Sequence, residues 1–192
     1  MSQTFKPAPP GAVAIIWTLG FIGGFAFFAV RIVLAASAGV SPDLYDVGGA
    51  FILLICIIYG WARSAKSYRV SEGELNIDRA AMKGVSVPLE MVKSAESKPD
   101  IGSFFNMSML SSGGLFGWGG RANVRKPMDI NSMVAYVYGA NPKNSVLFSI
   151  EGGKNIIVTP ADPQGFLAAI RKASVRPPTA PATNPPKKKR KH

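Results

Sequence analysis

Two apolar runs near the start of the chain, residues 12–30 and 44–62, constrain its fold more than any other feature. A helix rises 1.5 Å per residue, so a helix of about 19 residues is roughly 28 Å long, close to the thickness of a bilayer's hydrocarbon layer. Ten Val, Ile, Leu or Phe side chains in the first run contribute roughly −4.5 kcal/mol to membrane insertion. The second run is less apolar because Asp46 lies near its start. We therefore expect an N-terminus of residues 1–11 and a transmembrane hairpin over residues 12–62, with helices at about 12–37 and 44–62.

Two other interpretations of these runs are less consistent with the sequence. Residues 36–38 (ASA) have the small-residue form of a signal-peptide cleavage site, but the apolar stretch before them is about 23 residues, longer than a signal peptide's hydrophobic region. A buried helix of a soluble protein would need a polar face, and residues 21–30 offer none. The hairpin remains the prediction.

The distribution of basic residues predicts the orientation of the hairpin. Four of them flank its outer ends: Lys6, Arg63, Lys66 and Arg69. On the side of the connecting loop, Arg31 is the lone cation, beside Asp43 and Asp46. The positive-inside rule then places both termini in the cytoplasm of a multi-pass inner-membrane protein. Arg31 is expected to reach the interface or pair with one of the two aspartates, as an anchor rather than a transport group.

Gly20 and Gly24 have the Gly-xxx-Gly spacing that lets a second helix approach closely. Packing between the chain's own two helices explains this spacing without a dimer.

The residue types argue against catalysis and against a bound metal or cofactor. Cys56, the only cysteine, lies inside the second apolar run, so no disulfide can form within the chain. His192, the only histidine, is the last residue, which removes most familiar metal sites and histidine-activated nucleophiles. Four scattered carboxylates are interpreted as solvated surface charges: Glu90, Glu96, Asp100 and Asp129. The sequence predicts a protein that is not an enzyme.

From Tyr68 onward the pattern changes to short β-type runs separated by turn residues. Alternating apolar residues predict strands near residues 68–70, 75–77, 85–89, 134–138 and 146–150, and the apolar run at residues 156–158 predicts another. Pro88 marks an edge strand or a strand end. The turns at residues 72–73, 141–144 and 152–153 are expected to form hairpins, giving an antiparallel meander.

The meander is expected to end in one amphipathic helix. Asp162 is its predicted N-cap and Pro163 its first residue, and Phe166, Leu167 and Ile170 lie on one face.

Six or seven short strands followed by one helix resemble the pleckstrin-homology-like fold, a bent β-barrel capped by a C-terminal helix. Residues 68–71 (YRVS), 75–77, 87–89, 113–119 (GGLFGWG) and above all 158–166 (VTPADPQGF) are similar to bacterial pleckstrin-homology domain proteins, which commonly follow membrane helices. The resemblance covers roughly residues 66–173 and implies an α+β protein with a PH-like domain at residues 63–174. Residues 121–132 depart from the pattern and are interpreted as an inserted loop.

The resemblance does not imply specific recognition of inositol phosphates. Pleckstrin domains that bind these ligands use several converging cations in the loop between their first two strands, whereas residues 78–84 offer only Arg79 and Lys83. Protein binding or scaffolding is the better expectation.

The glycine-rich stretch at residues 113–120 lacks the Gly-Lys-Ser/Thr ending of a phosphate-binding loop. It is interpreted either as an exposed loop whose Leu115, Phe116 and Trp118 contact the membrane or a partner, or as simple packing against the barrel.

The last 18 residues, 175–192, form a Pro-rich, polybasic tail that we expect to be disordered. Five consecutive cations end it: Lys187, Lys188, Lys189, Arg190 and Lys191. Near a membrane such a run is interpreted as an electrostatic tether to anionic lipid, to which Arg63, Lys66 and Arg69 would add. The alternative is a merely solubilising tail, and no nucleic-acid partner is expected.

Together these features predict a non-enzymatic, membrane-anchored PH-like domain that binds or scaffolds a membrane protein partner or the anionic lipid surface. The alternative is an accessory subunit of a membrane enzyme or transporter, with the chemistry in another chain.

Overall fold

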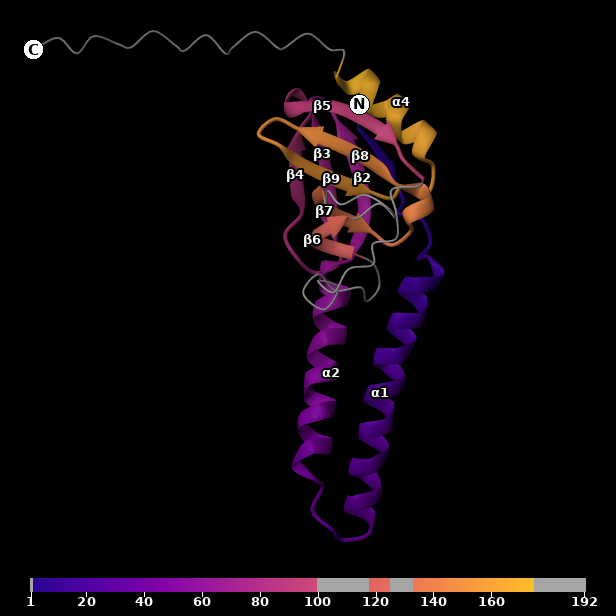
Figure 1. Ribbon diagram of the computed structural model, residues 1–192, viewed down its shortest axis with the longest axis vertical. Helices are drawn as coiled ribbons and strands as arrows, with labels where there is room; N and C mark the ends of the chain where they lie inside the picture. Colours follow the sequence, from indigo (N-terminus) through magenta and orange to yellow (C-terminus); the bar gives the residue numbers. More distant parts are fainter. Residues whose placement is uncertain (1, 100–117, 125–132, 175–192) are drawn as a thin grey trace, which may run out of the picture.

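The computed structural model describes residues 2–99, 118–124 and 133–174. Two long helices run side by side as a hairpin, and the strands and the C-terminal helix form a domain at the open end of that hairpin (Figure 1). The chain's first residues lie inside this domain rather than apart from it.

The hairpin consists of α1 (Ala12–Ser37) and α2 (Leu44–Arg63). Both helices are long and apolar enough to cross a membrane. Most of their large apolar side chains are exposed, because the two helices cover only a narrow strip of each other. Asp43 caps α2 by accepting a hydrogen bond from the Tyr45 amide at 3.0 Å, which satisfies one of the free amides of the first turn.

The first sheet contains four antiparallel strands in the order β1-β2-β3-β4. These strands are β1 (Gln3–Phe5), β2 (Ala65–Ser71), β3 (Glu74–Arg79) and β4 (Val85–Pro88). Gly73, with φ of 78°, forms the predicted turn between β2 and β3. Pro88 ends the edge strand β4, as expected, because a proline has no amide to donate to a neighbouring strand. Sequence reasoning did not predict β1.

The second sheet has five strands in the order β5-β8-β9-β7-β6. They are β5 (Val92–Ser97), β6 (Trp118–Val124), β7 (Met133–Gly139), β8 (Val146–Ile150) and β9 (Lys154–Val158). Gly152 and Gly153, with φ of 82° and 75°, form the predicted hairpin between β8 and β9. Among the described strands, hydrogen bonds do not close the two sheets into a barrel, and the arrangement is PH-like.

The prediction of a purely antiparallel meander is wrong. β9 lies between β7 and β8 and pairs with β7 in parallel. Residues 141–144, which include the 3-10 helix η2 (Pro142–Asn144), are therefore a connection past β9 and not a hairpin turn. Turn residues predict that the chain reverses locally, but they do not specify which strand it then pairs with.

The interpretation of residues 121–132 as an inserted loop is also wrong in part. Residues 121–124 belong to β6, which pairs antiparallel with β7. The strand was missed because its sequence, WGGRANV, has two glycines and no apolar alternation. The remaining residues of that stretch, 125–132, lie outside the described part of the chain.

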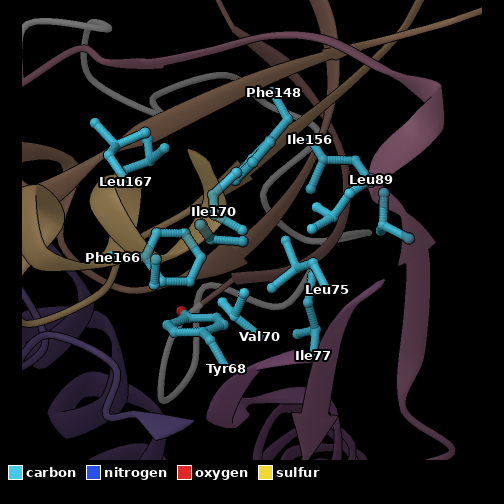
Figure 2. Packing of buried hydrophobic residues seen from close by; sticks show 14 of the residues in the cluster. Tyr68, Val70, Leu75, Ile77, Leu89, Phe148, Ile156, Phe166, Leu167 and Ile170 are labelled. Carbon is cyan, nitrogen blue, oxygen red and sulfur yellow. The ribbon is translucent and has the colours of Figure 1, made fainter. Parts of the chain in front are cut away.

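The core lies between the two sheets and is closed by α4 (Pro163–Ser174). Phe166 of α4 is fully buried, and the centroid of its ring is 5.2 Å from that of Phe5, 5.9 Å from that of Tyr68 and 6.1 Å from that of Phe148. Figure 2 shows Phe166 beside Tyr68 in this core. Asp162 caps the helix by accepting from the Gly165 amide at 3.0 Å, as predicted. The short 3-10 helix η1 (Leu89–Met91) adds Leu89 to the same core.

A buried tyrosine hydroxyl connects the two sheets. Tyr68 of β2 donates to the Tyr138 carbonyl at the end of β7 at 2.7 Å and accepts from the Thr159 amide, just after β9, at 3.3 Å. Burial is the largest effect on this group and raises the pKa of Tyr68 to about 12, against the lowering effect of the Thr159 hydrogen bonds.

The N-terminal segment fastens α1 to the same end of the domain. The Ala8 amide donates to the Thr159 carbonyl at 2.7 Å, and the Gly11 amide donates to the Ala140 carbonyl at 2.9 Å. Gly139 has to be glycine, because a Cβ there would lie 1.9 Å from the Thr159 hydroxyl oxygen.

The other helix, α2, continues through Ser64 directly into β2. The β3–β4 loop then braces the end of α2. The Ala80 amide donates to the Ser64 carbonyl at 3.0 Å, and the Ala81 amide donates to the Ala62 carbonyl at 3.2 Å. Both helices are thus held against the domain by backbone hydrogen bonds.

We predict that Tyr68→Phe lowers the free energy of unfolding by about 1–3 kcal/mol, because the buried Thr159 amide and Tyr138 carbonyl lose their partner. Thermal unfolding of the full chain in detergent, followed by circular dichroism, measures the loss. Tyr136→Phe removes a hydroxyl from a side chain that is 37% exposed and is the matched control. Equal stability of the two variants would contradict the prediction.

The same hydrogen-bonded phenol makes stability depend on alkaline pH. Its folded pKa of about 12 lies above the ordinary value of 10.0, so its contribution is fully present below pH 10 and is lost as the pH rises towards 12. That contribution is about 2–3 kcal/mol. The Tyr68→Phe variant should therefore lose less stability than the wild type between pH 10 and 12, while Tyr136→Phe should follow the wild type.

Candidate functional site

The end of the domain next to the helices is strongly basic. Residues 59–66 at the end of α2, residues 79–84 between β3 and β4, and residues 139–145 after β7 lie there, and β6 also contacts α2. The first three segments carry five basic residues and no Asp or Glu: Arg63, Lys66, Arg79, Lys83 and Lys143. We call these five residues the basic rim.

The pairing of β2 with β3 brings Arg79 close to the end of α2. Arg79, the last residue of β3, is opposite Ala65 in the β2–β3 pairing, two residues after Arg63. Its Nε donates to the Lys83 carbonyl at 2.7 Å, and Nη2 donates to the same oxygen. Nη1 is 3.9 Å from Met82 Sδ, and a thioether sulfur is only a weak acceptor. The guanidinium of Arg79 is therefore held in place by its own loop.

Arg63 is positioned by Tyr59, one helical turn earlier. Its guanidinium carbon lies 5.0 Å from the centroid of the Tyr59 ring, and Nη1 donates to the Tyr59 hydroxyl at 2.5 Å. The Nε of Arg63 is buried and has no hydrogen-bond partner. A buried N–H group without an acceptor is unusual in a folded protein.

Both arginines act on the phenol of Tyr138. Burial is the largest effect and raises the pKa of Tyr138, while the positive charges of Arg79 and Arg63 lower it. Positive charges from two different elements thus act on the same phenol.

Of the other predicted lipid-surface residues on this part of the chain, Lys66 is exposed and Arg69 is ion-paired. Arg69 Nη2 lies 2.7 Å from Asp78 Oδ1, and Ser67 donates to Asp78 Oδ2 at 2.7 Å. The hydrogen bond with Asp78 raises the pKa of Arg69, and that same bond is the largest cause lowering the pKa of Asp78. Arg69 therefore contributes less free positive charge than the basic rim does.

The opposite end of the domain has the opposite charge. The β2–β3 turn, η1 and the β8–β9 hairpin lie together there, since the Leu89 amide donates to the Gly73 carbonyl and the Glu151 amide donates to the Met91 carbonyl. These segments and their flanks carry four glutamates against two lysines: Glu72, Glu74, Glu90 and Glu151, and Lys93 and Lys154. The domain is thus basic near the helices and rich in carboxylates far from them.

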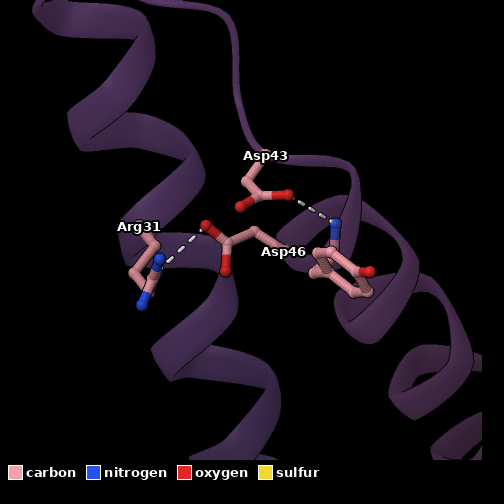
Figure 3. Close-up of polar contacts among 4 residues, drawn as sticks. Arg31, Asp43 and Asp46 are labelled. Atoms are coloured by element: carbon pink, nitrogen blue, oxygen red, sulfur yellow. Dashed lines mark hydrogen bonds and ion pairs between the residues drawn. The ribbon is translucent and has the colours of Figure 1, made fainter.

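Inside the hairpin, Arg31 pairs with Asp46 at 3.0 Å between Nε and Oδ2, and Asp43 caps α2 instead (Figure 3). The residue Asp46 is only 6% exposed, whereas the Arg31 side chain is 52% exposed and lies over the Phe27 ring. The carboxylate is therefore neutralised by the other helix.

The glycines of the predicted packing motif differ in their surroundings. A Cβ at Gly24 would lie 3.2 Å from Leu53 of α2, whereas a Cβ at Gly20 would meet nothing within 4 Å. Gly49 was not predicted, yet a Cβ there would lie 2.9 Å from the Phe28 ring. A small residue among apolar ones on α2 was the signal that could have identified it.

Several predicted residues cannot be placed. Leu115, Phe116 and the five cations at residues 187–191 lie outside the described part of the chain. Trp118 is the first residue of β6, and only its backbone is described. In the described residues no group of three or more His, Cys, Asp or Glu side chains could hold a metal ion.

Comparison with known proteins identifies the family. The sequence model of the bacterial PH domain family matches residues 66–174, more than half of the chain. The chain belongs to the bacterial PH domain family, whose members are generally non-enzymatic. No curated protein and no solved structure matches the chain.

We predict that removing either member of the Arg31–Asp46 pair weakens the hairpin by about 1 kcal/mol, because one charge or carboxylate is left in an apolar setting. Arg31→Gln, Asp46→Asn and the double variant, measured by thermal unfolding in detergent, give the coupling energy. Additive losses would show that the pair contributes nothing.

Proposed function

We propose that this member of the bacterial PH domain family is a non-enzymatic binding or scaffolding protein, held on the inner face of the membrane by its helical hairpin. One observation carries the proposal. Two apolar helices of membrane-crossing length are each joined to the PH domain by backbone hydrogen bonds.

The side chains of the hairpin support a membrane location. At the domain end of α2, Tyr59 and Trp61 are 45% and 50% exposed, which suits aromatic residues at the membrane–water interface. Arg63 follows at once, and the rest of the basic rim lies on the domain side of these aromatics. An excess of Lys and Arg at this end favours a cytoplasmic domain.

The attachment of both helices to the PH domain supports a role in which the orientation of the domain relative to the membrane matters. A domain on a flexible linker would sample many orientations, whereas Gly11 and Ser64 connect the helices to the domain with no free segment between. Such a domain meets only ligands within reach of the membrane surface, and their effective concentration is correspondingly high.

A membrane protein is the partner class that we propose. In the described part of the domain, three large apolar side chains are exposed by more than a third: Met91, Val134 and Tyr136. Val134 and Tyr136 are two residues apart on β7, so their side chains lie on the same face of the strand and form a small exposed apolar patch. Tyrosine is one of the residue types that most often contribute strongly to binding at protein interfaces.

We predict that the inter-helix loop is outside the cytoplasm and the domain inside. In a Cys56→Ser background, a membrane-impermeant maleimide should label Ser41→Cys in cells with an intact inner membrane. Gln164→Cys, on an exposed position of α4, should react only after permeabilisation. Labelling of Gln164→Cys in intact cells would overturn the orientation.

We also predict that a photoreactive residue at position 136 forms a discrete adduct with a membrane protein in living cells, while the same residue at Lys154, an exposed position in the β8–β9 hairpin, does not. Tyr136→Ala should reduce recovery of that partner with the tagged full chain by at least about tenfold. Capture of an enzyme or transporter in stoichiometric amounts would instead identify the chain as its accessory subunit. Equal adducts at both positions would argue against a defined partner surface.

A further inference from the structure

Arg63 and Arg79 come from different elements, and neither forms an ion pair among the described residues. The Ala65–Arg79 pairing and the Ala80 to Ser64 hydrogen bond fix the end of β3 against the end of α2. Since these are backbone contacts, the two cations are brought together by the fold itself and not by a chance side-chain conformation.

Each arginine is held in place while retaining donors for a ligand. A guanidinium has five N–H groups. The Lys83 carbonyl engages Nε and Nη2 of Arg79, while Nη1 faces the sulfur of Met82. Arg63 uses Nη1 for the Tyr59 hydroxyl, and its Nε is buried and closed to a ligand. Its Nη2 has no hydrogen-bond partner among the described residues and remains for a ligand.

The chemistry of this place suits a phosphate. The β2–β3 pairing sets Arg79 opposite Ala65, two residues after Arg63, and Lys83, whose carbonyl accepts from Arg79, is exposed. Guanidinium groups bind phosphate oxygens through paired hydrogen bonds, which a diffuse lysine cluster does not provide.

The position of the site relative to the membrane indicates that the phosphate belongs to a lipid. Arg63 ends α2 two residues after Trp61, so in a membrane-crossing hairpin both guanidinium groups lie at the level of the lipid headgroups.

We propose that Arg63 and Arg79 form a binding site for the phosphate of an anionic phospholipid at the junction of α2 and the PH domain. The proposal rests on the proposed function, because it requires the hairpin to span the membrane. Lys83 and Lys143 of the basic rim add attraction without contributing to the fixed geometry.

The test measures phosphatidylglycerol bound to the purified full chain in neutral detergent, by native mass spectrometry and lipid titration. The double variant Arg63→Gln/Arg79→Gln should bind at least about tenfold more weakly, because two charge-assisted contacts are lost. The matched control, Lys93→Gln/Lys154→Gln, removes two charges from exposed positions at the opposite end of the domain. It should change binding by no more than about twofold, since the site depends on position and not on net charge. Equal losses in the two double variants would overturn the proposal.

A second pair of variants separates geometry from charge, and also covers a failure of the glutamine variants to fold. Arg63→Lys/Arg79→Lys keeps both charges but loses the guanidinium forks, and should still weaken binding by at least about fivefold. Wild-type affinity in this variant would show diffuse attraction and overturn the site. Deleting residues 187–192 should leave the affinity of the site within about twofold.

Two further measurements distinguish the sources of phosphate and the possible failures. Inorganic phosphate competing as strongly as phosphatidylglycerol would identify a free-phosphate site and overturn the lipid assignment, as would equal binding of phosphatidylcholine. Alkaline carbonate extraction of the wild type tests membrane integration by itself. A chain that is extracted contradicts the proposed function, whereas a chain that stays integral but binds phosphatidylglycerol equally in all variants contradicts only the lipid site.

Discussion

The hydroxyl of Tyr68 is the one contact on which the arrangement of the domain depends most. It joins β2 of the first sheet to the ends of β7 and β9 in the second, through the Tyr138 carbonyl and the Thr159 amide. Both partners are buried, so a missing hydroxyl would leave two polar groups unsatisfied in the core. The carbonyl of Thr159 in turn receives the Ala8 amide. The contact between the two sheets and the attachment of the N-terminal segment therefore both involve Thr159.

The helix-proximal end of the domain is fixed by backbone contacts on the same support. Backbone hydrogen bonds fix the start of α1 at Gly11 and the end of α2 at Ala62 and Ser64. Arg79 ends a strand that is paired with β2, so its position follows from the same sheet that Tyr68 anchors. A binding group on such a support loses little conformational freedom when it meets a ligand, which favours a site over a loose patch of charge.

The sequence predicted the elements whose pattern is local and missed those that depend on distant partners. The apolar runs predicted both helices. The alternation in β7 and β8, the short apolar run in β9 and the Asp162 cap were sufficient to predict these strands and α4. β1 (QTF) and β5 (VKSAES) have no such pattern, and the parallel pairing of β7 with β9 has no local signal at all. The candidate phosphate site also depends on residues that are distant in the sequence. Arg79 and Lys83 were too few for a phosphate site within their own loop, and only the β2–β3 register adds Arg63 from another element.

The direction of α4 distinguishes the basic rim from the basic tail as the means of contacting lipid. α4 contacts β5 and η1 and ends away from the hairpin (Figure 1), so the tail begins at the end of the domain opposite the basic rim. The two ends of the domain are separated by roughly the length of β2, about 23 Å at 3.3 Å per residue for its seven residues. Attraction between charges farther apart than about 8 Å is screened at physiological salt, so cations at the end of α4 act little on a surface at the other end. In the orientation proposed above, Arg63 and Arg79 lie at the level of the headgroups, and their position depends on the fold alone. We therefore expect the basic rim to determine which lipids lie beneath the domain.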